Sequence, residues 1–114
     1  MVPVGRLRRT IDVQRVRREG TTRSDALFHV TALATRQREA RLAIGVPARL
    51  GGAVLRNRAR RRARAAFERA LSGAEAGADL LVTVRRPALE ASFPALAGSA
   101  AELLRSLGVV PAEP

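Results

Sequence analysis

A chain of 114 residues, 46% of them hydrophobic, is long enough for one domain with a modest core and too apolar for a disordered basic tail. Its formal net charge is +11, and all 21 basic residues are arginine, which suits a polyanionic partner such as nucleic acid or an acidic membrane surface. The absence of cysteine excludes disulfides and zinc–thiolate sites, and a single histidine cannot build a multi-histidine metal site.

The first third of the chain predicts a basic arm, a short helix and a strand. The arm covers residues 1–9, and the helix begins near Thr10 and ends at Gly20. Residues 25–35 are rich in strand-forming side chains and follow a turn-like GTTRS segment. No segment has the apolar character of an export signal or of a membrane span of ~18 residues, so we expect a soluble cytoplasmic protein.

Residues 41–46 predict a second strand with two unlike sides. One side is apolar and the other carries mostly small residues, since Leu42, Ile44 and Val46 alternate with Arg41, Ala43 and Gly45. Small residues on that second side leave room for something to lie against the sheet.

The rest of the chain predicts a loop, two helices and a third strand. They are a loop over 47–52, a helix over 53–71, a strand over 78–86, a helix over 92–108 and a frayed tail over 109–114. Ser92 is placed to cap the last helix, with Pro94 in its first turn and Gly108 as its C-terminal stop. We therefore expect a single α/β domain of the α+β kind over residues 10–108, with the order α-β-β-α-β-α and a small sheet packed by helices.

Arginines dominate the helix over residues 53–71. Six of the nine residues from Arg56 to Arg64 are arginine, and no acidic residue follows until Glu68. On a helical wheel the apolar residues form a stripe roughly 120° wide, made of Leu55, Ala59, Ala63, Ala66, Phe67 and Ala70, with Leu55 and Phe67 as the larger anchors. The remaining surface carries Arg56, Arg60 and Arg64 on one flank, Arg58 and Arg62 on the other, and Asn57 and Arg61 pointing away from the core.

Three interpretations of this charge were weighed. A merely solvated helix would interleave glutamate at i, i+4 spacing, and that support is absent. A membrane-surface helix would carry large apolar residues where this one carries mostly alanine. Nucleic-acid phosphates that supply the missing negative charge fit best, with Arg58, Arg61 and Arg64 on solvent faces. Charge alone leaves the choice between DNA and RNA open.

Residues 41–67, RLAIGVPARLGGAVLRNRARRRARAAF, resemble the signature region of the bacterial ribonuclease P protein subunit. In that family a strand of the form R-V/L-G-L/I-x-V leads through a basic loop and GNAV into a helix with an RNRxxRxxR core. This chain matches the core with Arg56, Asn57, Arg58, Arg61 and Arg64. The resemblance covers about residues 5–107, because DVQRVRREG, VTVRRPA and SFPALAGSAAELLRSL are similar to the family's first helix, last strand and final helix.

The resemblance implies a fold and a function. The fold has a small mixed sheet in which two parallel strands flank the arginine helix in a left-handed crossover, an exception to the usual right-handed rule. The function is that of a protein subunit that binds the catalytic RNA of ribonuclease P and the 5′ leader of precursor tRNA and assists removal of the leader. The RNA would use Mg²⁺ and carry the chemistry. The protein would bind no cofactor itself and act as a monomer in a one-protein, one-RNA complex.

Charge pattern and resemblance together imply two sets of site residues. Residues expected to bind RNA are Arg56, Asn57, Arg58, Arg60, Arg61, Arg62 and Arg64. A cleft between the first helix and the sheet would hold the leader, lined by Val13, Arg17, Phe28, Thr31 and Arg49. The family often places aromatic residues where this chain has Val13, Arg17 and Thr31. Leader binding is therefore expected to depend more on Arg17 and Arg49, through charge and guanidinium stacking.

Independent catalysis by the protein is disfavoured. The sequence offers no nucleophile with a base and no paired carboxylates, and the densest acidic group, Asp12, Glu19 and Asp25, lacks recognisable metal-site spacing. His29 is expected to be a partly buried structural histidine. Two other functions stay open at this point: a ribosomal or nucleoid structural protein without an enzymatic role, and a self-sufficient nuclease.

Overall fold

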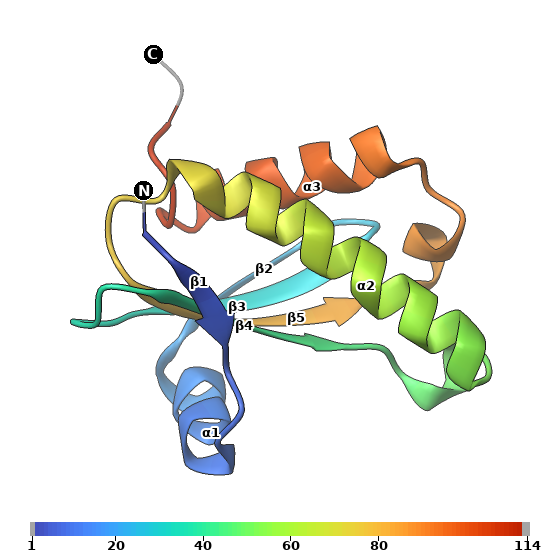
Figure 1. Cartoon of the computed structure of the whole chain (residues 1–114), viewed down its shortest axis with the longest axis horizontal. Coiled ribbons are helices and arrows are strands. Elements are labelled where there is room, and N and C mark those ends of the chain that lie inside the picture. The colour runs from blue at the N-terminus through green and yellow to red at the C-terminus, as the bar shows by residue number, and fades with distance from the viewer. Residues whose placement is uncertain (1, 113–114) are drawn as a thin grey trace.

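A five-stranded mixed sheet forms the middle layer of the molecule, with α1 on one face and α2 and α3 on the other (Figure 1). The computed structural model describes residues 2–112. In chain order the elements are β1 (Val4–Arg6), α1 (Thr10–Glu19), β2 (Thr21–Ser24), β3 (Phe28–Ala34), β4 (Ala40–Gly45), α2 (Ala53–Ala70), β5 (Ala78–Val84) and α3 (Phe93–Ser106). Short 3₁₀ turns at Ala48–Leu50, Leu71–Gly73 and Arg86–Leu89 join them.

The three predicted helices and three predicted strands are confirmed, and two short strands were missed. β2 lies in the segment predicted as turn-like and pairs with β3 as an antiparallel hairpin. All four of its residues are exposed, so it has no buried side of its own that the sequence could reveal. β1 lies within the arm of residues 1–9 and pairs in parallel with β4. The backbone N–H of Leu7 extends this pairing by donating to the carbonyl of Leu42 at 3.1 Å.

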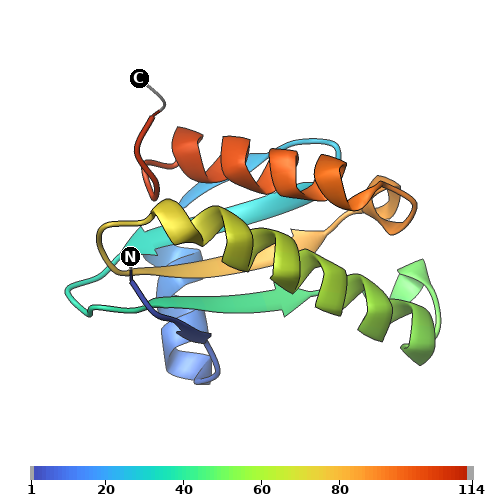
Figure 2. The same ribbon diagram turned by 45° about the horizontal axis from the view of Figure 1, so that its top comes forward.

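The strand order across the sheet is β1-β4-β5-β3-β2. β4 and β5 are parallel neighbours, joined through α2. Seen from the helix side with both strand tips pointing right, β5 lies above β4 and α2 passes in front of them (Figure 2). This path makes the β4–α2–β5 connection left-handed, as the family resemblance implied and against the usual preference.

The main core lies between the sheet and the layer formed by α2 and α3. Phe28 of β3 meets Phe67 of α2 edge to face, with ring centroids 5.0 Å apart and planes at 77°. Alanines of the predicted apolar stripe are buried against the sheet at positions 59, 63 and 66. Leu55 was expected to be the second large anchor, and this was wrong. Its side chain is 42% exposed, because the first turn of α2 extends past the core.

The C-terminal helix follows its predicted boundaries. The Ser92 hydroxyl caps α3 by accepting from the backbone N–H of Ala95 at 3.2 Å, and Pro94 lies in the first turn. The tail was expected to be frayed from residue 109, but Val110 is buried and its N–H reaches the carbonyl of Leu104. Residues 113–114 of that tail lie outside the described part of the chain. None of the helices among residues 2–112 is both long and apolar enough to cross a membrane.

Candidate nucleic-acid interface

The arginine face of α2 is largely uncompensated. The helix begins after Gly52, its first turn holds no acidic residue, and Arg58 and Arg61 are exposed. Among residues 2–112, these arginines form a single ion pair, which joins Arg64 to Glu68 with N and O 3.9 Å apart. The N-terminal end of a helix carries a partial positive charge, and the arginines of α2 add full positive charges beside it. Together they favour an anionic partner.

Several of these arginines are held in place by neutral acceptors. Arg60 donates to the side-chain oxygen of Asn57 at 2.8 Å, and Arg62 donates to the carbonyl of Ala91 at 2.5 Å. Such contacts fix the guanidinium groups without cancelling their charge. The nearby Arg56 has a buried Nε for which the described residues provide no hydrogen-bond partner. On both flanks of α2, therefore, arginines are held by neutral acceptors and keep their positive charge.

Arg64 differs from the expectation that it lies on a solvent face. Its side chain is only 19% exposed and donates to the carbonyl of Leu42 on β4 at 3.3 Å. Burial lowers the pKa of Arg64, and the positive charge of Arg6 on β1 lowers it further, while Glu68 opposes both. The expectation failed because the wheel places residues around α2 but does not show that β1 and β4 lie beside this flank. Arg6 thereby joins the same positive surface.

A cleft opens on the opposite face of the sheet, beside α1. Its volume is about 460 Å³, and its walls are α1 and the hairpin strand β2 while its floor is formed by β3, β4 and β5. We call it the α1 cleft and define it by its lining residues, which are Val13, Arg17, Thr22, His29, Thr31, Ala43, Ile44, Gly45, Leu81, Val82 and Thr83. Ala43 and Gly45 are the small side predicted for the second strand, and they keep the floor open.

The α1 cleft brings together three of the five residues predicted for it: Val13, Arg17 and Thr31. Phe28 is not among them, and its proposed place on the cleft wall was wrong. Alternation along β3 turns its ring to the other face of the sheet, where it is fully buried against α2. Arg49 is exposed on the turn after β4 and does not line the cleft either.

His29 is a cleft residue that the sequence analysis assigned differently. It was expected to be a partly buried structural histidine, but it is exposed on the cleft floor and its Nδ1 lies 2.5 Å from the hydroxyl of Ser24. Thr22 also lines the cleft, and its hydroxyl lies 3.0 Å from that of Thr31. Strand alternation was the available signal, since His29 stands two positions from Thr31 on the same strand.

An ion-pair cluster fixes α1 against the sheet. Arg41 of β4 donates to both carboxylate oxygens of Asp79 on β5, at 2.8 and 2.6 Å, and to Asp12 of α1 at 3.3 Å. Both carboxylates are buried. Hydrogen bonding to Asp79 raises the pKa of Arg41, with a further contribution from Asp12, although burial opposes it. This cluster sets where α1 stands, and therefore where one wall of the cleft lies.

The three acidic residues considered for metal chemistry lie in separate contacts. Asp12 pairs with Arg41, and Glu19 pairs with its neighbour Arg18 at 3.2 Å. Asp25 accepts from the backbone N–H groups of Leu27 and Phe28, at 2.8 and 2.9 Å, and so shapes the β2–β3 turn. Asp12 thus orients α1 and Asp25 shapes a turn, while Glu19 forms only an exposed pair with its neighbour.

An α+β domain with an arginine helix in one layer and an open cleft beyond the sheet defines a nucleic-acid-binding protein. The family model described as Ribonuclease P matches residues 1–108. The chain is 41% identical over 108 residues to the ribonuclease P protein component of Chloroflexus aurantiacus, covering 94% of this chain and 80% of that one. It is 42% identical over 106 residues to the corresponding component of Roseiflexus castenholzii, covering 92% and 87%. The chain belongs to the ribonuclease P protein family.

Solved structures agree with this assignment. The RNase P protein of Staphylococcus aureus superposes with a TM-score of 0.79 at 28% identity, covering 92% of this chain and 96% of that one. The RNase P protein of Thermotoga maritima gives a TM-score of 0.79 at 26% identity, covering 89% and 96%. The function is therefore that of the protein component of an endoribonuclease that processes tRNA, and the ribosomal or nucleoid alternative is not supported. Membership in this family also implies an RNA partner.

Proposed function

We propose that this chain assigns its two faces to two RNAs. The arginine face of α2 docks on the catalytic RNA of ribonuclease P, and the α1 cleft holds the 5′ leader of precursor tRNA. The observation that carries this proposal is the position of the two features on opposite faces of one sheet. α2 covers one face of the sheet, and α1, which forms a wall of the cleft, lies on the other (Figure 1). A thin sheet between them allows one small protein to contact both RNAs at once.

Charge supports the assignment of α2 to the larger RNA. A folded catalytic RNA presents a dense phosphate surface, and the arginine helix offers charge that its own acidic residues do not neutralise. If six arginines each contact a phosphate, the affinity should fall about 10³-fold between 50 and 200 mM salt, on the scale known for duplex DNA. Positions 56, 58, 60, 61, 62 and 64 are the arginines we assign to this surface, together with Asn57.

The shape and chemistry of the α1 cleft suit a single strand. Its floor mixes hydroxyls, an imidazole and small apolar side chains, and Arg17 stands on the α1 wall. Arginine can pair with a phosphate and stack its guanidinium plane on a base, which replaces the aromatic stacking found elsewhere. The hydroxyl of Thr22 and the ring of His29 can donate or accept, so they tolerate different bases.

The reaction itself belongs to the RNA in this proposal. Mg²⁺ held by the RNA subunit supplies the catalytic metal, and one protein joins one RNA in the cytoplasm. Arginine charge placed between two polyanions lowers their repulsion, so precursor tRNA and Mg²⁺ bind more readily. Family membership and the basic helix support this division of labour.

A competition experiment tests the assignment of α2. Labelled catalytic RNA from the same organism is bound to the full chain, and unlabelled catalytic RNA is compared with a ribosomal RNA fragment of equal length as competitor. The proposal predicts that the cognate RNA competes at least about 100-fold better, since specific binding exceeds non-specific binding by larger factors in many systems. Equal competition by both RNAs would mean that α2 is a general polyanion surface.

A further inference from the structure

The start of α2 contains an apolar pocket that the charge argument does not explain. We propose that this pocket receives an unpaired nucleobase of the catalytic RNA and clamps it between aliphatic side chains and arginine. The inference rests on the proposed function, which places α2 against that RNA. It adds a base contact to a surface so far described only by phosphate charge.

Exposure of large apolar side chains identifies the pocket. Among residues 2–112, the large hydrophobic residues that stand exposed are Ile11, Val54 and Leu55, at 57, 86 and 42%. Val54 and Leu55 both line this pocket, whereas Ile11 lies on α1. Neighbouring exposed apolar residues on a strongly charged helix favour an occupant that covers them.

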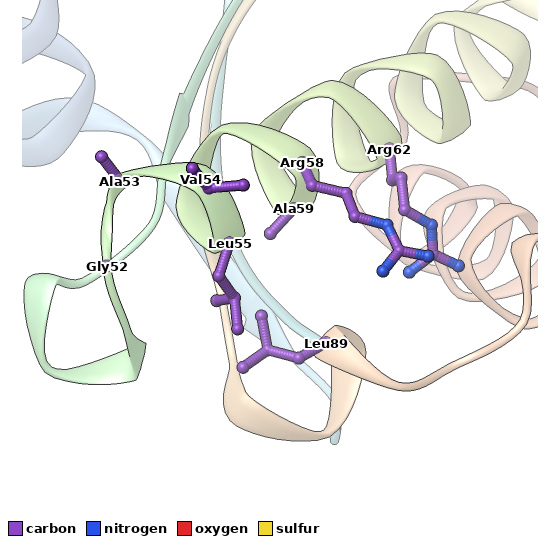
Figure 3. A pocket seen from close by; sticks show the side chains of 8 residues that line it. All are labelled: Gly52, Ala53, Val54, Leu55, Arg58, Ala59, Arg62 and Leu89. Atoms are coloured by element: carbon purple, nitrogen blue, oxygen red, sulfur yellow. The ribbon is translucent and has the colours of Figure 1, made fainter.

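The pocket has two walls from segments distant in the sequence. Leu55 of α2 faces Leu89 of the turn after β5, and the side chains of Arg58 and Arg62 extend side by side from the helix (Figure 3). Arg62 also donates to the carbonyl of Ala91, two residues beyond Leu89. This hydrogen bond ties the helix to the opposite wall, so the pocket is formed before any ligand arrives.

The size and charge of the pocket favour a nucleobase. Its volume is about 540 Å³, within the range of ~300–1,000 Å³ typical of small-ligand sites. No acidic residue lines it, and Arg58 and Arg62 supply positive charge at its edge. An unpaired base has an apolar face for Leu55 and Leu89, a polar edge, and a phosphate for arginine. A purely apolar protein segment would leave the two charges unmatched.

Replacement of Leu55 tests the proposed base contact without changing the charge of the surface. Leu55→Ala removes apolar area and no charge, so we expect affinity for the catalytic RNA to fall about 5- to 20-fold, as for loss of a base-stacking contact, with an unchanged salt slope. Ile11→Ala is the matched control, because it shortens an even more exposed apolar side chain that lies outside the pocket, and it should leave affinity unchanged. Val54→Ala, at the most exposed position, provides a second test should Leu55→Ala alter the circular dichroism spectrum.

Cross-linking identifies the occupant. The chain contains no cysteine, so Leu89→Cys accepts a single photo-cross-linker at the pocket wall. Cross-links confined to one or two unpaired nucleotides of the bound catalytic RNA would support the proposal. Cross-links spread along paired RNA, or equal affinities of the Leu55→Ala and Ile11→Ala proteins, would overturn it. If the unaltered chain failed to bind the catalytic RNA specifically, the proposed function itself would fail, which is a different result.

Discussion

Arg41 and Asp79 stand directly opposite each other on the parallel strands β4 and β5, and the guanidinium of one donates two hydrogen bonds to the carboxylate of the other. The same guanidinium reaches Asp12, so a single side chain joins two strands of the sheet to α1. This contact lies on the α1 face of the sheet, whereas α2 and its arginines cover the other face. Arginine thus has two separate roles in this protein, as a structural clamp and as a binding surface.

Removal of the clamp should destabilise the fold. Arg41→Met keeps much of the side-chain volume but leaves Asp79 buried without its cation and Asp12 with only Arg15, 3.6 Å away. Loss of one partner costs about 3–5 kcal/mol in comparable buried pairs. Urea unfolding should report this loss as a lower midpoint with a similar slope. Arg23→Met, at an exposed position on β2, should change stability by less than about 0.5 kcal/mol. Equal midpoints for the two variants would show that the cluster contributes little.

Exposed arginines of α2 should affect RNA binding and not folding. Arg58→Ala and Arg61→Ala should each weaken affinity for the catalytic RNA and reduce the salt slope by about 1, because each removes one phosphate contact. Thermal unfolding should be unchanged. Arg64→Ala should lower both affinity and melting temperature, since its side chain also donates to the Leu42 carbonyl. A loss of stability in all three variants would contradict the assignment of Arg58 and Arg61 to the binding surface.

Arg17 should contribute to recognition of the leader. Arg17→Ala should reduce the affinity of the protein–RNA complex for precursor tRNA by about 5- to 20-fold, the scale of one stacked or charged contact, and leave affinity for mature tRNA unchanged. The measurement is equilibrium binding of both tRNAs to the assembled complex. Arg18→Ala, on the same helix but outside the cleft lining and away from the Asp12 cluster, is the control. An equal loss for precursor and mature tRNA would argue against a leader in this cleft.

Gly45 should keep the cleft open. A Cβ at Gly45 would find its nearest neighbour, the carbonyl oxygen of Val82, at 3.9 Å, so a side chain fits without disturbing the strand. Gly45→Leu should therefore fold normally and fill the floor, which reduces precursor-tRNA affinity about tenfold or more by blocking part of a stacked strand. Gly98→Leu is the control. It adds the same side chain to α3, on the other face of the sheet, and should leave the affinity for precursor tRNA unchanged. Normal leader discrimination by the Gly45→Leu protein would exclude the cleft as the leader site.

Much of the architecture could be predicted because the main elements carry strong local signals. The alanine stripe of α2, the alternation of β4 and the Ser92 cap each depend on residues within one segment. β1 and β2 lack such signals, since each is a short strand at an edge of the sheet. Their pairing is decided by contacts with β4 and β3 that are distant in sequence or formed by a tight hairpin.

Part of the candidate site could also be predicted from the sequence. Val13, Arg17 and Thr31 meet in one cleft, as the family resemblance implied. Phe28 does not join them, because alternation along β3 places Phe28 and Thr31 on opposite faces of the sheet. The alternation that buries Phe28 on one face of the sheet places its neighbour His29 on the cleft face. Assigning the two faces of β3 correctly would therefore have moved Phe28 to the core and His29 to the cleft. The clamp formed by Arg41 could not be foreseen, because Asp79 is 38 residues away in the chain.

Cleavage of precursor tRNA by the cognate catalytic RNA, with and without this protein, tests the central claim most directly. The assay is run at low Mg²⁺ and near-physiological salt, where repulsion between the two RNAs limits binding. The account predicts a protein-dependent rise in cleavage at the mature 5′ end, and no cleavage by the protein alone. An unchanged rate despite tight binding of the protein to the catalytic RNA would contradict the claim that it assists leader removal.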